Sequence, residues 1–205
     1  MKAAHRIVQL GITGGMGVGK TTVCRVFQCL NIPVFDADQE AKALYESDEE
    51  VRHELIQLLG RDIYLGKKIN KPLLASHIFS NPEIRHKINE LIHPRVGQLS
   101  KTWFQQQKAP YGIKEAALLL ESGAYKELDA IILVSAPMPW RLEQLKKRNP
   151  DWSMQEIQQR IDAQWQDKMR KPFCRFQIQN AGHEFLIPQI LAIHHQILKQ
   201  YVEAS

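Results

Sequence analysis

The sequence predicts an α/β fold in which a parallel sheet flanked by helices is interrupted by a helical insertion. A strand, a glycine-rich loop, a helix and a second strand follow one another within about 30 residues, which is the pattern of a βαβ unit. Residues 38–107 then carry helical patterns with little strand signal, and apolar strands resume after residue 110. Because strands joined by helical crossovers pair in parallel, we expect one sheet built from both ends of the chain.

The first strand is predicted by IVQLGI at residues 7–12, a short run that is rich in β-branched residues and ends in glycines. Val23, Phe27 and Leu30 follow at helical spacing, and Pro33 lies beyond that helix. A second strand, PVF, stops at Asp36.

The insertion carries its own helix signals. Ser47 and Glu50 form a capping-box pattern ahead of an apolar run, and Gly60 is placed to end that helix. Residues 81–83, Asn-Pro-Glu, start another helix, which we expect His93 and Pro94 to interrupt.

Three strands are predicted in the second half, in YGIKEAALLL, AIILVS and RFQIQ. A helical hairpin at residues 139–148 and 153–169 precedes the last of them, and its second helix opens with a capping box of Ser153 and Glu156. A helix rich in leucine and isoleucine, residues 187–202, closes the pattern.

Composition narrows the class of protein. The chain has 205 residues, of which 44% are apolar and 24% charged, which suits one packed domain with an insertion. Cys24, Cys29 and Cys174 are odd in number and lack metal-ligand spacing, so we interpret them as reduced thiols. No apolar run approaches the roughly 20 residues of a membrane span, and the basic start at residues 2–6 lacks a signal-peptide core. We therefore expect a cytoplasmic protein without a membrane partner; the oligomeric state is not encoded in any recognisable pattern.

The net charge of +5 is concentrated late in the chain, because residues 141–175 hold nine Lys and Arg against five Asp and Glu. This segment has no nucleic-acid module and no repeat of stacking aromatic residues. The sequence therefore favours a small phosphorylated ligand and no nucleic-acid partner.

The glycine-rich loop matches G-x-x-x-x-G-K-[ST], the phosphate-binding P-loop, between a predicted strand and a predicted helix. Backbone N–H groups in such a loop and at the helix N-terminus surround a polyphosphate. We expect ATP to bind here, with Lys20 at the β- and γ-phosphates and the Thr21 hydroxyl on Mg²⁺. The expected nucleotide-binding residues are Gly14, Gly15, Gly17, Val18, Gly19, Lys20, Thr21 and Thr22.

Four carboxylates are candidates for the chemistry. Asp36 ends a strand, at the sheet edge where ligands bind, and is expected to accept a proton from an attacking hydroxyl or to bind Mg²⁺. Asp38 suits either function or a helix cap. The usual apolar strand ending in Asp is missing, so Glu115 and Glu121 are alternatives for the outer shell of the metal, or ordinary surface residues.

Cationic side chains decorate the late helical hairpin. As a group they are expected to neutralise charge during phosphoryl transfer, while the hairpin acts as a lid that excludes water. They are Arg141, Arg148, Arg160, Lys168, Lys171 and Arg175.

Taken together, these residues resemble the dephospho-CoA kinase family over nearly the whole chain. The matching segments, in the order of the family, are GITGGMGVGKTT, VFDADQEAK, LIHPRV, LLLESGAYKELDAIILVSAP, RLEQLKKR and SMQEIQQRIDAQ. The loop alone occurs in many kinases, whereas the Asp36 to Asp38 segment, the His93-Pro94 pair, residues 118–123 and the spacing of Arg160 and Gln164 are more specific.

The resemblance implies transfer of the γ-phosphoryl group of ATP to the ribose 3′-hydroxyl of dephospho-CoA, with Mg²⁺. It implies a P-loop kinase core (residues 1–39, 109–138 and 173–205), a helical substrate domain (40–108) and a lid (139–172). By resemblance Asp36 is the general base, Arg141 and Arg160 are lid arginines, and Thr21, Asp36 and Glu115 are the metal candidates. The expected acceptor site comprises Asp36, Asp38, His93, Pro94 and Leu118.

The chain departs from the family pattern in two places. Glu115, Ala116 and Ala117 replace an aspartate, a hydrophobic residue and a proline, and a glutamate can still serve the metal shell. CRFQIQN keeps Asn180 but carries Arg175 and Gln177, so no adenine contact is assigned there. Two alternatives stay open at this point: a P-loop kinase of another small alcohol, such as a nucleoside or sugar, and a non-catalytic nucleotide-binding module.

Overall fold

The computed structural model describes residues 6–181 and 185–203 of the chain. It divides into two compact units, one made of Met1–Asp36 with Trp103–Ser205 and the other of Ala37–Thr102. Residues 2–5 of the basic start lie outside the described residues. Within the described residues, no helix has the length and apolar character needed to cross a membrane.

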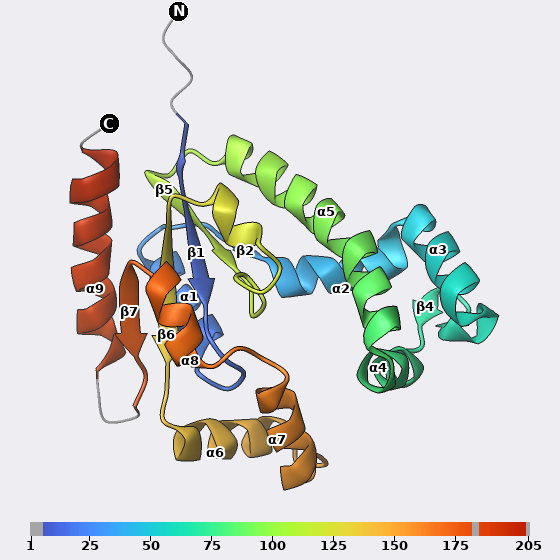
Figure 1. The fold of residues 1–205 in the computed structure, drawn as a ribbon. Helices are drawn as coiled ribbons and strands as arrows, with labels where there is room; N and C mark the ends of the chain where they lie inside the picture. Colours follow the sequence, from blue (N-terminus) through green and yellow to red (C-terminus); the bar gives the residue numbers. More distant parts are fainter. Residues whose placement is uncertain (1–5, 182–184, 204–205) are drawn as a thin grey trace, which may run out of the picture. The chain divides into compact units, whose positions relative to one another are not determined.

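The first unit is built on a five-stranded sheet in the order β2-β5-β1-β6-β7, and every pairing in it is parallel (Figure 1). The strands are β1 (Val8–Thr13), β2 (Val34–Asp36), β5 (Tyr111–Glu115), β6 (Ala130–Ser135) and β7 (Phe176–Gln179). The central strand β1 pairs Leu10 with Ile113 on one side and with Ala130 on the other. The predicted α/β fold with a parallel sheet is therefore confirmed.

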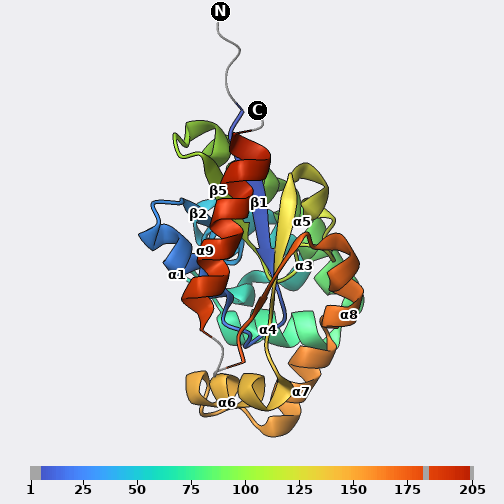
Figure 2. The same ribbon diagram turned by 90° about the vertical axis from the view of Figure 1, so that its left-hand side faces the viewer.

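Two helices from opposite ends of the sequence cover one face of this sheet, α1 (Lys20–Cys29) and α9 (Leu186–Ile197), which Figure 2 shows side by side in front of the strands. Phe27, Tyr111, Ile190 and Ile193 share the core between these helices and the sheet. Burial of such side chains stabilises the unit by roughly 1.5–3 kcal/mol each.

The other described elements of the first unit are helices, among them those of the segment expected to form the lid. They are η2 (Ala124–Glu127), α6 (Met138–Arg148), α7 (Met154–Asp162), α8 (Asp167–Arg170), η3 (Lys171–Phe173) and the π-helical turn η4 (Leu198–Val202). The predicted capping box is present, since Ser153 Oγ accepts from Glu156 N at 3.1 Å and the Glu156 carboxylate accepts from Ser153 N at 2.8 Å.

The second unit is mainly helical. Its elements are α2 (Ala37–Ser47), α3 (Glu49–Leu59), η1 (Arg61–Ile63), β3 (Tyr64–Leu65), β4 (Lys68–Ile69), α4 (Lys71–Ser80) and most of α5 (Pro82–Gln106). The antiparallel pair β3 and β4 is too short to leave a strand pattern in the sequence.

Four boundary predictions were wrong. Helix α5 continues through Pro94, because a stripe of buried residues including Ile88, Ile92 and Val96 runs past the proline, which is itself exposed. The N-cap of α3 is Asp48, whose carboxylate accepts from Glu50 N and Val51 N, while the Ser47 hydroxyl donates to Ala43 O.

The other two wrong predictions concern the residues at which a strand and a helix end. Strand β5 ends at Glu115, and a turn follows it. The second lid helix stops at Asp162, and a separate helix, α8, begins at Asp167.

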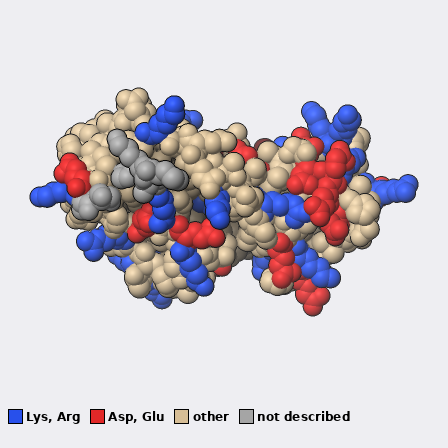
Figure 3. Space-filling model, turned by 90° about the horizontal axis from the view of Figure 1, so that it is seen from above, with Lys and Arg blue, Asp and Glu red and all other residues tan. Residues whose placement is uncertain are grey.

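The face drawn in Figure 3 carries charged side chains of both signs. Patches of Lys and Arg and patches of Asp and Glu both appear on it. This mixture agrees with the small net charge of +5.

Candidate active site

The phosphate loop connects β1 to α1 and needs glycine at its two ends. Gly14 has φ 153° and Gly19 has φ 89°, in the region that other residues rarely adopt. A β-carbon on Gly14 would lie 2.2 Å from Val134 O, and one on Gly19 would lie 2.4 Å from Asn180 Nδ2. Close approach of the loop to β6 at Gly14 and to the Asn180 side chain at Gly19 therefore explains these two glycines.

The first turn of α1 is open to an anion. Gly19 is the N-cap, no described side chain caps it, and the first turn contains no acidic residue. The N–H groups at a helix N-terminus and the positive end of the helix dipole suit phosphate oxygens, so this end of α1 is a candidate phosphate site.

Lys20 brings a cation to the same loop. Its ammonium Nζ donates to Gly14 O at 3.0 Å and to Gly15 O at 3.4 Å. The side chain therefore folds back over the loop that is expected to surround the phosphates.

Two carboxylates meet at the carboxyl ends of neighbouring strands. Asp36 ends β2 and pairs in register with Glu115, which ends β5. The Thr21 hydroxyl donates to Glu115 Oε1 at 3.2 Å. Burial raises the pKa of Glu115, which is 6% exposed, and the charge of Asp36 raises it further, whereas Lys20 and the Thr21 hydrogen bond act in the opposite direction.

These oxygens suit a hard cation that binds together with a substrate. Among the described residues, no group of three or more His, Cys, Asp and Glu can hold a metal by itself. Mg²⁺ is usually held by one or two protein oxygens, water and substrate phosphates. The Thr21 hydroxyl and the Glu115 carboxylate fit that pattern.

The two lid arginines lie in different environments. Arg141, in α6, is 9% exposed, and its Nε donates to Met16 O in the phosphate loop at 2.9 Å. Burial lowers the pKa of its guanidinium. Arg160, in α7, stacks on the Trp152 ring with its guanidinium carbon 4.1 Å from the ring centroid. The structure thus brings Arg141 to the loop and holds Arg160 within the helical hairpin.

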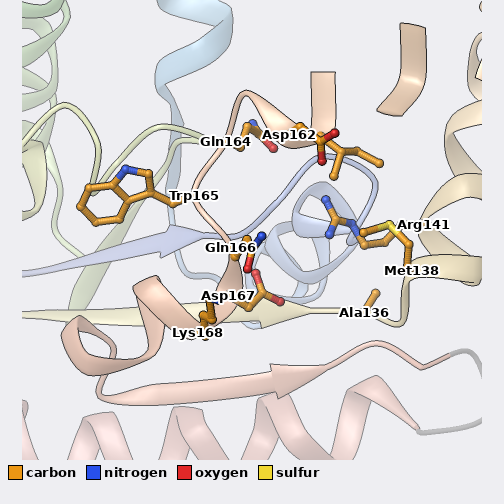
Figure 4. Close-up of a pocket in the computed structure, with 10 residues that line it drawn as sticks. Ala136, Met138, Arg141, Asp162, Gln164, Trp165, Gln166, Asp167 and Lys168 are labelled. Carbon is orange, nitrogen blue, oxygen red and sulfur yellow. The ribbon is translucent and has the colours of Figure 1, made fainter. Parts of the chain in front are cut away.

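A cavity of about 500 Å³ opens beside Arg141 (Figure 4). Its lining contains the cations Arg141 and Lys168 and the carboxylates Asp162 and Asp167, together with Gln164 and Trp165. Because both signs of charge are present, the lining as a whole is not a dedicated anion site.

The other expected acceptor residues are spread over both units. Asp38 lies in the first turn of α2 as its second residue, so it is not the N-cap of that helix. His93 and Pro94 are exposed on α5. Leu118 follows β5 in the first unit and is 38% exposed.

Several contacts to the site were not predicted. Asn180 Nδ2 donates to Val18 O at 2.9 Å, and Gln164 Oε1 accepts from Met16 N at 2.8 Å. Glu121, considered above for the metal, accepts from Arg170 Nη2 at 2.8 Å and from Trp165 N. The spacing of Arg160 and Gln164 in the sequence marked Gln164 as a candidate. It did not indicate that Met16 would be its partner.

A phosphate loop at a helix N-terminus, with a lysine over it, a hydroxyl and carboxylate pair beside it and a helical hairpin against it, defines a P-loop kinase. The comparisons identify the family. The family model described as dephospho-CoA kinase matches residues 8–184, and the chain therefore belongs to the dephospho-CoA kinase family. Relatives named dephospho-CoA kinase include one from Bacteroides fragilis, 36% identical with 91% of both chains covered, and one from Porphyromonas gingivalis, 31% identical with 91% and 93% covered. The family model and these relatives show an ATP-dependent kinase with the activity of a dephospho-CoA kinase.

Solved structures give the same fold. A Thermus thermophilus protein matches with a TM-score of 0.83 at 27% identity, covering 94% of this chain and 98% of the other. A dephospho-CoA kinase from Campylobacter jejuni matches with a TM-score of 0.68 at 19% identity, covering 93% and 97%. At that identity the second likeness supports the fold alone.

Proposed function

We propose that this protein transfers the γ-phosphoryl group of ATP to the ribose 3′-hydroxyl of 3′-dephospho-CoA and so forms coenzyme A. The observation that carries the proposal is the convergence of Lys20, the Thr21 and Glu115 pair, and Asp36 at the carboxyl ends of β1, β5 and β2. The named relatives favour this acceptor over another small alcohol. Nothing in the site favours a module without activity, since each group that the chemistry needs is present.

In this proposal the amides of residues 17–22 and the Lys20 ammonium hold the β- and γ-phosphates of ATP. Thr21 and Glu115, with Asp36 beside them, hold Mg²⁺, which when bound neutralises charge on the phosphate oxygens. Asp36 accepts the proton of the 3′-hydroxyl as that oxygen attacks the γ-phosphorus, and ADP leaves.

The lid supplies the remaining charge neutralisation. Arg141 uses Nε for Met16 O, so its two terminal nitrogens serve the phosphates. Arg160 leaves its position on Trp152 to join them when the lid closes. Asp38, His93, Pro94 and Leu118 contribute to acceptor binding, and the protein acts in the cytoplasm.

The test is ADP release with ATP and Mg²⁺, measured with and without dephospho-CoA. Acceptor-dependent release with a stoichiometric 3′-phosphorylated product is the expected result. A folded protein that binds ATP but releases no ADP with dephospho-CoA, and does so with a nucleoside or sugar, overturns the assignment of the acceptor.

A further inference from the structure

One residue of the phosphate loop is held by both ends of the lid hairpin. Met16 N–H donates to Gln164 Oε1 at 2.8 Å, and Met16 O accepts from Arg141 Nε at 2.9 Å. Arg141 lies in the first helix of the hairpin, and Gln164 follows the second. Both polar groups of the Met16 backbone are therefore engaged by the lid.

The Met16 side chain joins the same contact. It packs against the buried lid cluster of Leu145, Ile157 and Ile161, with Leu142 and Trp152 at its margin. This cluster holds α6 against α7, so the loop residue is part of the lid core.

The neighbours of Met16 leave room for this approach. A β-carbon on Gly15 would lie 2.5 Å from Arg141 Nη2, and one on Gly17 would lie 3.0 Å from Arg141 O. In the sequence GMG, Met16 therefore presents its side chain between two glycines that leave space for Arg141, and the positive φ of 80° at Gly17 further favours glycine there.

Hydrogen bonds hold the backbone at Gln164 and at the next residue. Its own N–H donates to Ile161 O at 3.1 Å, which closes the end of α7. The next residue, Trp165, donates its N–H to Glu121 Oε1 at 3.2 Å, and Glu121 is in turn bonded to the buried Arg170. The backbone on both sides of Gln164 is thus tied down, and its half-buried side chain reaches the loop from a defined position.

We propose that Gln164 is a positioning residue for nucleotide binding, which holds the phosphate loop in its curled form by accepting the Met16 N–H. The inference rests on the proposed function only in that the loop binds nucleotide phosphates. In the proposed function the amides of residues 17–22 hold the phosphates. Met16 lies just before them, and its N–H donates to Gln164 Oε1. A loop that is already curled loses less entropy on binding, so removing the acceptor weakens nucleotide affinity.

The experiment compares Gln164→Met, which keeps the length and removes the acceptor, with Gln164→Glu, which keeps an acceptor oxygen. Gln159→Met is the matched control, because it makes the same change of side chain at an exposed position of α7, the helix that Gln164 follows. The dissociation constant for ADP is measured by calorimetry, and exchange of the Met16 amide by NMR. Neither measurement involves the acceptor substrate, so a wrong assignment of dephospho-CoA leaves the test intact.

Gln164→Met is expected to raise the ADP dissociation constant about 5- to 20-fold, and the KM for ATP similarly, with kcat nearly preserved. Its Met16 amide exchanges faster, while Gln164→Glu and Gln159→Met keep wild-type protection of that amide. Unchanged or tighter ADP binding by folded Gln164→Met overturns the proposal. If Gln164→Met does not fold, the Met16 amide exchange of Gln164→Glu is the deciding measurement. Wild-type protection of that amide supports the proposal, and rapid exchange overturns it.

Discussion

Removal of the Glu121 carboxylate should strongly destabilise the first unit. Arg170 is 1% exposed, and its Nη2 lies 2.8 Å from Glu121 Oε1, with Asp167 Oδ1 3.4 Å from Nη1 as a second partner. In Glu121→Ala the guanidinium stays buried and charged with only the longer contact.

The magnitude follows from the cost of an uncompensated buried charge. Breaking a buried ion pair from one side costs about 3–5 kcal/mol, and the remaining Asp167 contact places this case near the lower end, at about 3 kcal/mol. In a chain of this length that corresponds to a fall in Tm of roughly 6–12 °C.

Urea denaturation and calorimetry measure this effect. The control is Glu143→Ala, which removes a pair of exposed side chains, Glu143 and Lys147, at 2.7 Å, and should cost less than about 1 kcal/mol. Replacing both charges with apolar residues, Glu121→Leu with Arg170→Met, should recover much of the loss. Equal small losses in Glu121→Ala and Glu143→Ala would refute the reasoning.

Three further outcomes are expected. Lys20→Ala should lower turnover at least about 100-fold with folding preserved, because a cation at the transferring phosphate is lost; ADP release and circular dichroism check this, and near-normal turnover contradicts it. Asp36→Asn should lower kcat by about 100-fold or more while ATP affinity changes little, as steady-state kinetics with calorimetry would show; a structural role would lower stability and spare kcat. Burial, and next the charge of His195, lower the pKa of His194, whose Nδ1 lies 2.6 Å from the Tyr111 hydroxyl. The stabilisation from neutral His194 is complete above its usual pKa of 6.5 and is lost as the pH falls through the lowered pKa. Between about pH 7.5 and about pH 5 the unfolding free energy of His194→Gln should therefore fall less than that of the wild type. An equal fall in the two proteins would contradict the assignment.

Local patterns in the sequence predicted most of the fold. The alternation of strands and helices, the glycine loop and the Ser153 capping box depend on neighbouring residues, and all of them are present. Where two local signals competed, the outcome depended on packing. Asp48 caps α3 in place of Ser47 and is also bonded to Arg95 at 3.4 Å, a contact that no local pattern contains.

Only part of the candidate site was predicted, because a sequence pattern shows neighbouring residues and not contacts between distant ones. Lys20 and Thr21 belong to a contiguous motif, whereas the partner of Thr21 is Glu115, 94 residues away. The contact of Met16 with Gln164 spans 148 residues. Such pairs depend on the order of strands in the sheet and on where the lid hairpin returns, and a single sequence does not encode either in a short pattern. The roles of Asp38, His93, Pro94 and Leu118 stay predictions.

The position of β1 at the centre of the sheet has a consequence for how the chain folds during synthesis. Its partners come from residues 111–115 and 130–133, so the strand that leads into the phosphate loop emerges long before either neighbour exists. The second unit, Ala37–Thr102, is contiguous in sequence, so its contacts can form before β1 has either of its partner strands. Asn180, which holds Val18, is made later still. The nucleotide site, although encoded near the start of the chain, is therefore among the last parts of the protein to be completed.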